Sequence, residues 1–311
     1  MIASSDPRVR LGGLIFFIVF IVLTFASFRR ERPFFAPQHK FAATGERPSW
    51  LIWTSSAVHL RQRREIIRST WQTLYKDVPF EARFVVGNPG PEWLPLLEQE
   101  NETYGDMIML ESASGDDRRF ATTHKPLEFW KYLLKQEKST GQKYDFVSKI
   151  DDDSFLDART FYREFLQPRV EVNHTLIARR CKSGIYWPAG MFYTLTWDLL
   201  EVVTKQYERD PFPLEHEDWP LGKMLHDAPE DYDFVNLDEK RAFDVVREGM
   251  VTKASILPHK MKKDEEYMWV AAMFNKKGFR GNKLGNINIE DKIREFASEG
   301  QQPNGWKCEG D

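Results

Sequence analysis

An unbroken apolar run covers residues 11–28, which read LGGLIFFIVFIVLTFASF and include no charged side chain. A helix of this length spans roughly 27 Å at about 1.5 Å per residue, close to the thickness of the hydrocarbon core of a membrane. A cleaved signal peptide is the alternative, but Thr24, Phe25 and Ala26 make a poor cleavage site. We therefore predict a transmembrane signal anchor over residues 11–28, preceded by a cytoplasmic tail over residues 1–10.

The segment that follows this run has no hydrophobic periodicity. Residues 29–48 mix Arg, Pro, Gln and Gly, which is typical of a stem between a membrane and a folded domain. The folded domain is expected to begin near Ser49 and to cover residues 49–311. Arginines lie on both sides of the apolar run, so the positive-inside rule does not decide the orientation of the anchor.

Short apolar runs alternate with longer amphipathic ones between residues 50 and 150. The runs predict strands at residues 50–54, 84–86, 107–110 and 144–150, and helices at residues 60–74, 92–104 and 123–136. Such alternation is typical of an α/β fold with a mainly parallel sheet. In these sheets ligands bind beyond the carboxyl ends of the strands. The last predicted strand is followed at once by three aspartates, Asp151, Asp152 and Asp153.

This acidic triplet is the first candidate for chemistry. Three adjacent carboxylates repel one another, which raises their pKa values unless a cation intervenes. A solvated surface loop is the alternative, but Phe146 and Phe155 bracket the triplet and indicate a nearby core. Carboxylate oxygens suit hard cations such as Mg²⁺ and Mn²⁺, which complete their coordination with phosphate oxygens and water. The position at a strand end favours a metal site.

A second acidic group offers a possible base. When a sugar leaves a nucleoside diphosphate, a divalent ion can stabilise the departing diphosphate, while an inverting reaction needs a base beside the acceptor hydroxyl. The best candidate is Asp218, within the segment EHEDWPLG of residues 215–222. Spacing alone favours a different interpretation, an acidic helix N-terminus.

Four blocks of sequence together carry a family resemblance. Residues 64–71 resemble R-x-x-I-R-x-T-W, residues 123–125 resemble T-x-K, and residues 149–155 match K-x-D-D-D-x-F at every fixed position. Residues 217–222 resemble E-D-V-x-x-G. With these blocks in this order, the chain resembles glycosyltransferase family 31, the β-1,3-galactosyltransferase-like group that includes the fringe-type enzymes.

The resemblance implies a GT-A-type fold, that is, a Rossmann-like mixed sheet flanked by helices. It implies inverting transfer of a hexose or N-acetylhexosamine from a UDP-sugar to a glycan hydroxyl on protein or lipid, through a β-1,3 linkage. It also implies dependence on Mn²⁺ and a single-pass type II protein of the Golgi membrane with its catalytic domain in the lumen.

The resemblance also assigns the metal site, residue by residue. Asp153 would be the direct metal ligand, and Asp151 and Asp152 would support the metal, the ribose or the donor sugar. The family uses a late histidine as a further ligand, and we expect His259 rather than His226 to be this residue. A lone histidine after a short apolar run is otherwise an ordinary surface or core residue.

Three basic residues and one acid complete the implied site. Asp218 would be the catalytic base, and Arg64, Arg68 and Lys125 would line the nucleotide side. Arg64 or Arg68 could instead be a structural ion-pair partner.

The chain departs from the family pattern in three places. Residues 118–121 lack the Asn and Tyr of the second block, and Trp219 and Pro220 replace an aliphatic and aromatic pair. Residues 185–193, IYWPAGMFY, replace a glycine-rich stretch that helps to shape the donor or acceptor site. These aromatic side chains could stack on sugar rings or belong to the core. The departures put the identity of the substrate in doubt more than the reaction class.

Other features set the context. Residues 101–103 and 173–175 fit the N-glycosylation pattern. Cys181 and Cys308 are the only cysteines, so they form either one disulfide or two free thiols, and two free thiols is the slightly favoured interpretation. The net charge of −3 gives no electrostatic case for binding nucleic acid.

Two other functions compete with the transferase hypothesis. A non-catalytic lumenal glycan-binding or chaperone protein could keep the fold, but a degenerate copy often loses either the triplet or the base. A metal-dependent phosphohydrolase or nucleotidyltransferase could also place aspartates after a strand. It does not explain the arginine-rich first helix together with the Glu217–Asp218 block.

Overall fold

The computed structural model describes residues 49–114, 118–214, 218–245, 247–296 and 308. The predicted tail, anchor and stem, residues 1–48, lie outside this range, so they stay predictions. Among the described residues, no helix combines the length and apolarity needed to cross a membrane.

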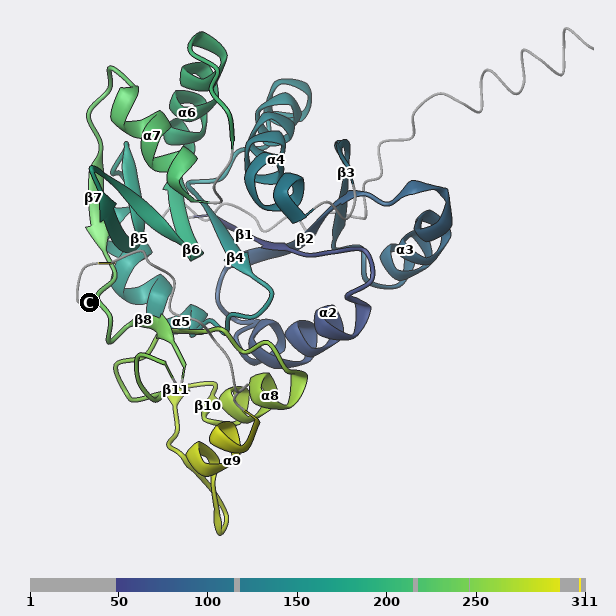
Figure 1. Ribbon diagram of the computed structural model, residues 1–311, viewed down its shortest axis with the longest axis vertical. Helices are drawn as coiled ribbons and strands as arrows, with labels where there is room; N and C mark the ends of the chain where they lie inside the picture. Colours follow the sequence, from purple (N-terminus) through teal and green to yellow (C-terminus); the bar gives the residue numbers. More distant parts are fainter. Residues whose placement is uncertain (1–48, 115–117, 215–217, 246, 297–307, 309–311) are drawn as a thin grey trace, which may run out of the picture. The chain divides into compact units, whose positions relative to one another are not determined.

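A mixed sheet of seven strands forms the centre of the domain (Figure 1). The strand order is β3-β2-β1-β4-β6-β5-β7. Strands β1 to β4 are parallel, β6 is antiparallel to both of its neighbours, and β7 is parallel to β5. The strands are β1 (Trp50–Ser55), β2 (Phe80–Asn88), β3 (Met107–Ser114), β4 (Phe146–Asp151), β5 (Thr175–Ser183), β6 (Ile185–Thr196) and β7 (Asp233–Asn236). The prediction of an α/β fold with a mixed, mostly parallel sheet is confirmed.

Helices cover both faces of this sheet (Figure 1). One face carries α4 (Arg118–Thr140), α6 (Trp197–Arg209) and α7 (Trp219–Asp227). On the other side lie α2 (Arg61–Ile67) and α5 (Ala158–Phe161), with α8 (Asp264–Ala272) against α2 and α9 (Ile289–Phe296) against α8, while α3 (Gly90–Tyr104) connects β2 to β3.

Strand β1 shows why the central strands are apolar throughout. Trp50 and Ile52 belong to the core on the α2 face, whereas Leu51 and Trp53 belong to the core on the α4 face. Side chains alternate along a strand, so a strand that is covered on both faces needs apolar residues at every position.

The remaining elements are short. Helix α2 continues into the π-helical turn η1 (Arg68–Gln72), and α5 continues into η2 (Tyr162–Leu166) and η3 (Gln167–Arg169). Three two-stranded sheets follow in the last third of the chain: β8 (Ala242–Asp244) with β9 (Leu257–His259), β10 (Phe274–Asn275) with β11 (Gly278–Phe279), and β12 (Lys283–Leu284) with β13 (Ile287–Asn288).

All seven elements predicted between residues 50 and 150 are present. Strand β2 is longer than expected because Phe80, Glu81 and Ala82 pair with Trp50, Leu51 and Ile52 of β1. Helix α2 buries basic as well as apolar side chains, since Arg63 and Arg64 are both buried.

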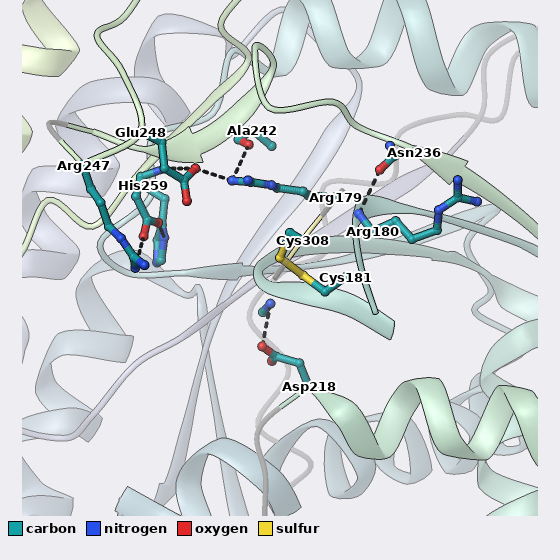
Figure 2. The surroundings of a disulfide bond; sticks show 12 residues. Arg179, Arg180, Cys181, Asp218, Asn236, Ala242, Arg247, Glu248, His259 and Cys308 are labelled. Atoms are coloured by element: carbon teal, nitrogen blue, oxygen red, sulfur yellow. Dashed lines mark hydrogen bonds and ion pairs between the residues drawn. A yellow bond between two sulfur atoms is a disulfide. The ribbon is translucent and has the colours of Figure 1, made fainter. Parts of the chain in front are cut away.

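The cysteines correct another expectation. Cys181 in β5 and Cys308 form a disulfide, so the favoured interpretation of two free thiols is wrong (Figure 2). Cys308 also forms a bridge of the antiparallel type with Cys181 through the backbone. The two residues lie 127 positions apart, and nothing local in the sequence indicates that they meet.

Candidate active site

The acidic triplet lies at the carboxyl edge of the sheet, as predicted. Asp151 ends β4 and pairs with Ser55, which ends β1. The chain beyond Asp151 then turns against the segment around His259. The amide of Met261 donates to the carbonyl of Asp153 at 3.1 Å, and the amide of Phe155 donates to the carbonyl of Pro258 at 3.0 Å. These backbone contacts fix the triplet against the start of the last third of the chain.

Asp151, Asp153 and His259 form a candidate metal centre. Their ligand atoms all lie within 4.8 Å of one another. Nε2 of His259 is 3.3 Å from Oδ1 of Asp153 and 3.8 Å from Oδ2 of Asp151. Asp153 and His259 are buried, while Asp151 is partly exposed. Two carboxylates and one imidazole are a donor set that Mn²⁺ and similar divalent ions accept.

The orientation of His259 suits a metal ligand. Its Nδ1 lies 2.7 Å from Oδ1 of Asp244, because parallel pairing of β8 with β9 sets Asp244 directly beside His259. A histidine that ligates a metal through one ring nitrogen usually donates the other N–H to a carboxylate, which fixes the tautomer and the ring plane. Here that arrangement leaves Nε2 facing the two aspartates.

The sequence alone did not identify Asp244 as a site residue. It lies fifteen residues before its partner, and only the β8–β9 pairing brings the two together. Its second oxygen accepts from Lys260 at 2.9 Å and lies 3.5 Å from a guanidinium nitrogen of Arg247. Burial acts to raise the pKa of Asp244, but His259 and Lys260 outweigh it and lower the pKa to about 2. The contacts with His259 and Lys260 therefore favour the charged form of Asp244.

The charged residues of this cluster shift one another's pKa values. Burial acts to lower the pKa of His259, but Asp153 and Asp244 raise it to about 10. Burial acts to raise the pKa of Asp153, and the positive charges of His259 and Lys262 hold it well below the usual range instead. For Asp152, burial and the charges of its two neighbours raise the pKa to about 7. The group therefore depends on compensating positive charge.

Two lysines supply part of that charge. Nζ of Lys149 lies 2.5 Å from Oδ1 of Asp151, and Lys262 forms an ion pair with Asp153. The lysines differ in burial, since the Lys149 side chain is 3% exposed and the Lys262 side chain is 58% exposed. Neither had a role in the sequence analysis, although Lys149 is the first residue of the K-x-D-D-D-x-F block.

Asp218 lies at the N-terminus of α7. Its Oδ2 accepts a hydrogen bond of 2.7 Å from the amide of Gly190 in β6 (Figure 2). The contact is close: a Cβ added to Gly190 would lie 2.0 Å from Oδ1 of Asp218. Glu217 lies outside the described residues. The helix-start interpretation and the base interpretation of Asp218 are therefore compatible, since the side chain faces a strand rather than its own helix.

Arg64 and Arg68 form buried ion pairs. Arg64 donates from Nε and from a terminal nitrogen to Glu100 at 2.8 and 2.7 Å. Arg68 donates to Glu100 at 2.8 Å and contacts Asp106 at 2.8 and 2.9 Å. This is the ion-pair alternative that the sequence left open, and it joins α2 and η1 to α3.

Lys125 and Arg63 hold the loops around the site. Nζ of Lys125 is buried and donates to the carbonyl of Ser56, just beyond β1, at 3.0 Å. Arg63 donates to the carbonyls of Met261 and Lys262 at 2.9 Å each. It also donates to the carbonyl of Asp152 at 3.4 Å. Arg63 therefore fixes the segment after His259 against α2.

The sequence also left alternatives for the metal-binding histidine and for the aromatic segment 185–193. His226 is exposed on α7 and is not part of the metal cluster, in agreement with the preference for His259. In the segment 185–193, Trp187 is 5% exposed and belongs to the core, whereas Tyr186 is 39% exposed. The core interpretation is confirmed for Trp187, and stacking of Tyr186 on a sugar ring stays a prediction.

Part of this site lies in the segment of the chain that family comparison identifies. Residues 62–186 match the model of the galactosyltransferase family. The predicted resemblance is confirmed by this match. The matched segment contains Arg64, Arg68, Lys125 and the acidic triplet, while Asp218 and His259 follow it. Among curated proteins, none is significantly similar to the chain in sequence.

Several solved structures are distantly similar. The galactosyltransferase LgtC, in complex with donor and acceptor sugar analogues, is 10% identical over 72% of this chain and 95% of its own, with a TM-score of 0.44. A 4-diphosphocytidyl-2C-methyl-D-erythritol synthase from Anaerococcus prevotii is 13% identical over 73% and 96%, with a TM-score of 0.42. The mannosyltransferase PcManGT from Pyrobaculum calidifontis, with GDP-Man and Mn²⁺, is 13% identical over 62% and 55%, with a TM-score of 0.36. At such low sequence identity and TM-score, these structures carry no argument about the function of this chain.

Proposed function

We propose that this protein is an inverting, metal-dependent glycosyltransferase of GT-A type that moves a hexose or N-acetylhexosamine from a UDP-sugar to a glycan hydroxyl. The acceptor glycan is on protein or lipid, and the linkage is β-1,3. One observation carries the proposal: the carboxylates of Asp151 and Asp153 and Nε2 of His259 converge at the carboxyl end of β4 in a chain that matches the galactosyltransferase family.

The donor set fits a divalent ion. Asp151, Asp153 and His259 would hold the metal, and Asp244 would keep Nε2 of His259 directed at it. The ion supplies Lewis-acid stabilisation of the charge that develops on the departing diphosphate. His259 must lose its proton at Nε2 to bind the metal, so metal binding releases a proton.

Asp218 is the base in this scheme. The acceptor hydroxyl oxygen forms a bond to the anomeric carbon while the bond from that carbon to the β-phosphate oxygen breaks. UDP leaves with that electron pair, and the hydroxyl proton passes to Asp218. The hydrogen bond from Gly190 fixes one oxygen of this carboxylate.

The cellular setting is part of the proposal. We place the protein in the Golgi membrane as a single-pass type II protein, with residues 11–28 as anchor and residues 49–311 in the lumen. The disulfide between Cys181 and Cys308 supports a location in an oxidising compartment.

The test is a panel of UDP-sugars, assayed for hydrolysis and transfer by the purified protein with and without Mn²⁺. We expect one donor to turn over only with the metal. Asp153→Ala should abolish donor binding, whereas Asp218→Asn should bind donor normally and lose turnover by roughly a hundredfold or more, because a base acts only in the transition state. Asp210→Asn, at an exposed aspartate after α6, is the control and should behave as wild type.

The outcomes separate the hypotheses. If no donor binds in a metal-dependent way, the transferase proposal is wrong, and binding of glycan alone would favour the non-catalytic alternative. If Asp218→Asn keeps full transfer, the assignment of the base is wrong while the metal site stands.

A further inference from the structure

Lys149 is a buried cation between the two halves of the proposed site. Its side chain is 3% exposed, and Nζ has two partners at 2.5 Å: Oδ1 of Asp151 and the backbone carbonyl of Gly190. Burying an ammonium group is costly unless it is paired and hydrogen-bonded. These two contacts help to hold the ammonium group of Lys149 between Asp151 and Gly190.

Gly190 lies in an irregular part of β6. Pairing between β5 and β6 passes from Ala178–Tyr193 directly to Arg180–Pro188, and the ladder between β4 and β6 ends at Ile150–Phe192, so Gly190 lies outside both registers. This bulge frees both polar atoms of the Gly190 residue for other partners. Its carbonyl accepts from Lys149, and its amide donates to Asp218 at 2.7 Å.

These contacts form a continuous chain from the metal ligands to the base. It runs from Asp151 to Lys149, then through the backbone of Gly190 to Asp218. Only a glycine fits at the third position, because a Cβ there would overlap the carboxylate of Asp218.

We propose that Lys149 is a positioning residue that couples the metal ligand Asp151 to the base Asp218 through the backbone of Gly190. The inference rests on the proposed function. With a divalent ion bound, Asp151 would share its negative charge with that ion, so its ion pair with Lys149 would weaken and the hydrogen bond from Lys149 to Gly190 would readjust. The base is thereby set in place in response to occupation of the metal site.

The coupling can be observed without turnover. Residues 189–190 are the only Ala-Gly pair in the sequence, so labelling alanine with ¹³C at the carbonyl and glycine with ¹⁵N identifies the Gly190 amide in an NMR spectrum. Mg²⁺ serves as a diamagnetic probe, and calorimetry reports its binding. In the wild type, Mg²⁺ should shift the Gly190 amide resonance.

The variant Lys149→Met keeps the length of the side chain and removes the charge. It should bind Mg²⁺ while the Gly190 amide no longer responds, and its kcat should fall roughly 10- to 100-fold with little change in the KM for the donor. Lys143→Met makes the same change at a lysine that is 54% exposed and should match the wild type. If Lys149→Met does not fold, Lys149→Gln replaces it, with the same expectation.

The outcomes are distinct. A wild type that binds Mg²⁺ with no shift at Gly190, or a Lys149→Met variant whose Gly190 amide responds as in the wild type, overturns the coupling and leaves the transferase proposal intact. A wild type that binds no divalent ion overturns both.

Discussion

Glu100 is the residue on which the arginines of α2 and η1 depend. It is 1% exposed and accepts hydrogen bonds from both Arg64 and Arg68. Burial acts to raise the pKa of Glu100, but the two guanidinium groups outweigh it and lower the pKa below its usual value. Removing one partner of a buried ion pair leaves the other charge uncompensated, at a cost of about 3–5 kcal/mol.

Glu100→Gln should therefore lower the free energy of unfolding at pH 7 by about 3 kcal/mol or more. Because the folded-state pKa is depressed, the stabilisation is present above the unfolded-state pKa of about 4.3 and is lost as the pH falls through the folded-state value. Urea unfolding at pH 7 and in acid tests this. The wild type should lose its advantage in acid, and Glu102→Gln, on an exposed part of α3, should change little. An equal effect of the two variants would contradict the assignment.

At the scale of single residues, local sequence predicted the acidic triplet well and its partners poorly. The triplet follows a recognisable strand, so its place at the sheet edge could be read from the pattern. His259 came only from the family resemblance, and Asp244 and Lys262 from neither source. These residues reach the site through backbone pairing between distant segments, and single-sequence patterns carry no record of such pairing.

Helix α7 sets the position of Asp218, and Gly222 allows this helix to approach β6. A Cβ at Gly222 would lie 2.4 Å from Cβ of Trp187 and 2.5 Å from the carbonyl oxygen of Tyr186. One of these neighbours is backbone, so α7 itself must move. Helix α7 begins immediately after Asp218, so the base would move with it.

Gly222→Ala should cost about 1–3 kcal/mol in stability through overpacking, and it should reduce turnover more than donor binding. Thermal unfolding and steady-state kinetics measure the two effects. Gly249→Ala is the matched control, because nothing lies within 4 Å of its added Cβ. If Gly222→Ala retains wild-type kinetics, the packing of α7 on β6 does not position the base.

At the scale of elements, prediction succeeded where strands and helices alternate with clear periodicity. Every element up to β4 was expected, because both faces of the central strands are covered and their apolar runs are continuous. Beyond β4 the strands give weaker signals. Strand β6 contains Pro188 and Gly190, both unusual within a strand, and β8 to β13 have only two or three residues each.

For the whole molecule, the site joins segments from most of the folded domain. The first half supplies the sheet edge and the triplet, α7 and β6 supply Asp218 and its hydrogen-bond partner Gly190, and the last third supplies His259 and Asp244. The disulfide between Cys181 and Cys308 closes a long loop around these later segments. Such a closure restricts the unfolded chain and stabilises the folded one.

The central claim is that Asp151, Asp153 and His259 hold a divalent ion through which a UDP-sugar binds. Calorimetry of UDP binding in the presence of Mn²⁺ or of EDTA tests it most directly. We predict binding with Mn²⁺, no binding with EDTA, and loss of Mn²⁺-dependent binding in His259→Ala. Equal binding of UDP in EDTA, or wild-type Mn²⁺ binding by His259→Ala, would contradict the account.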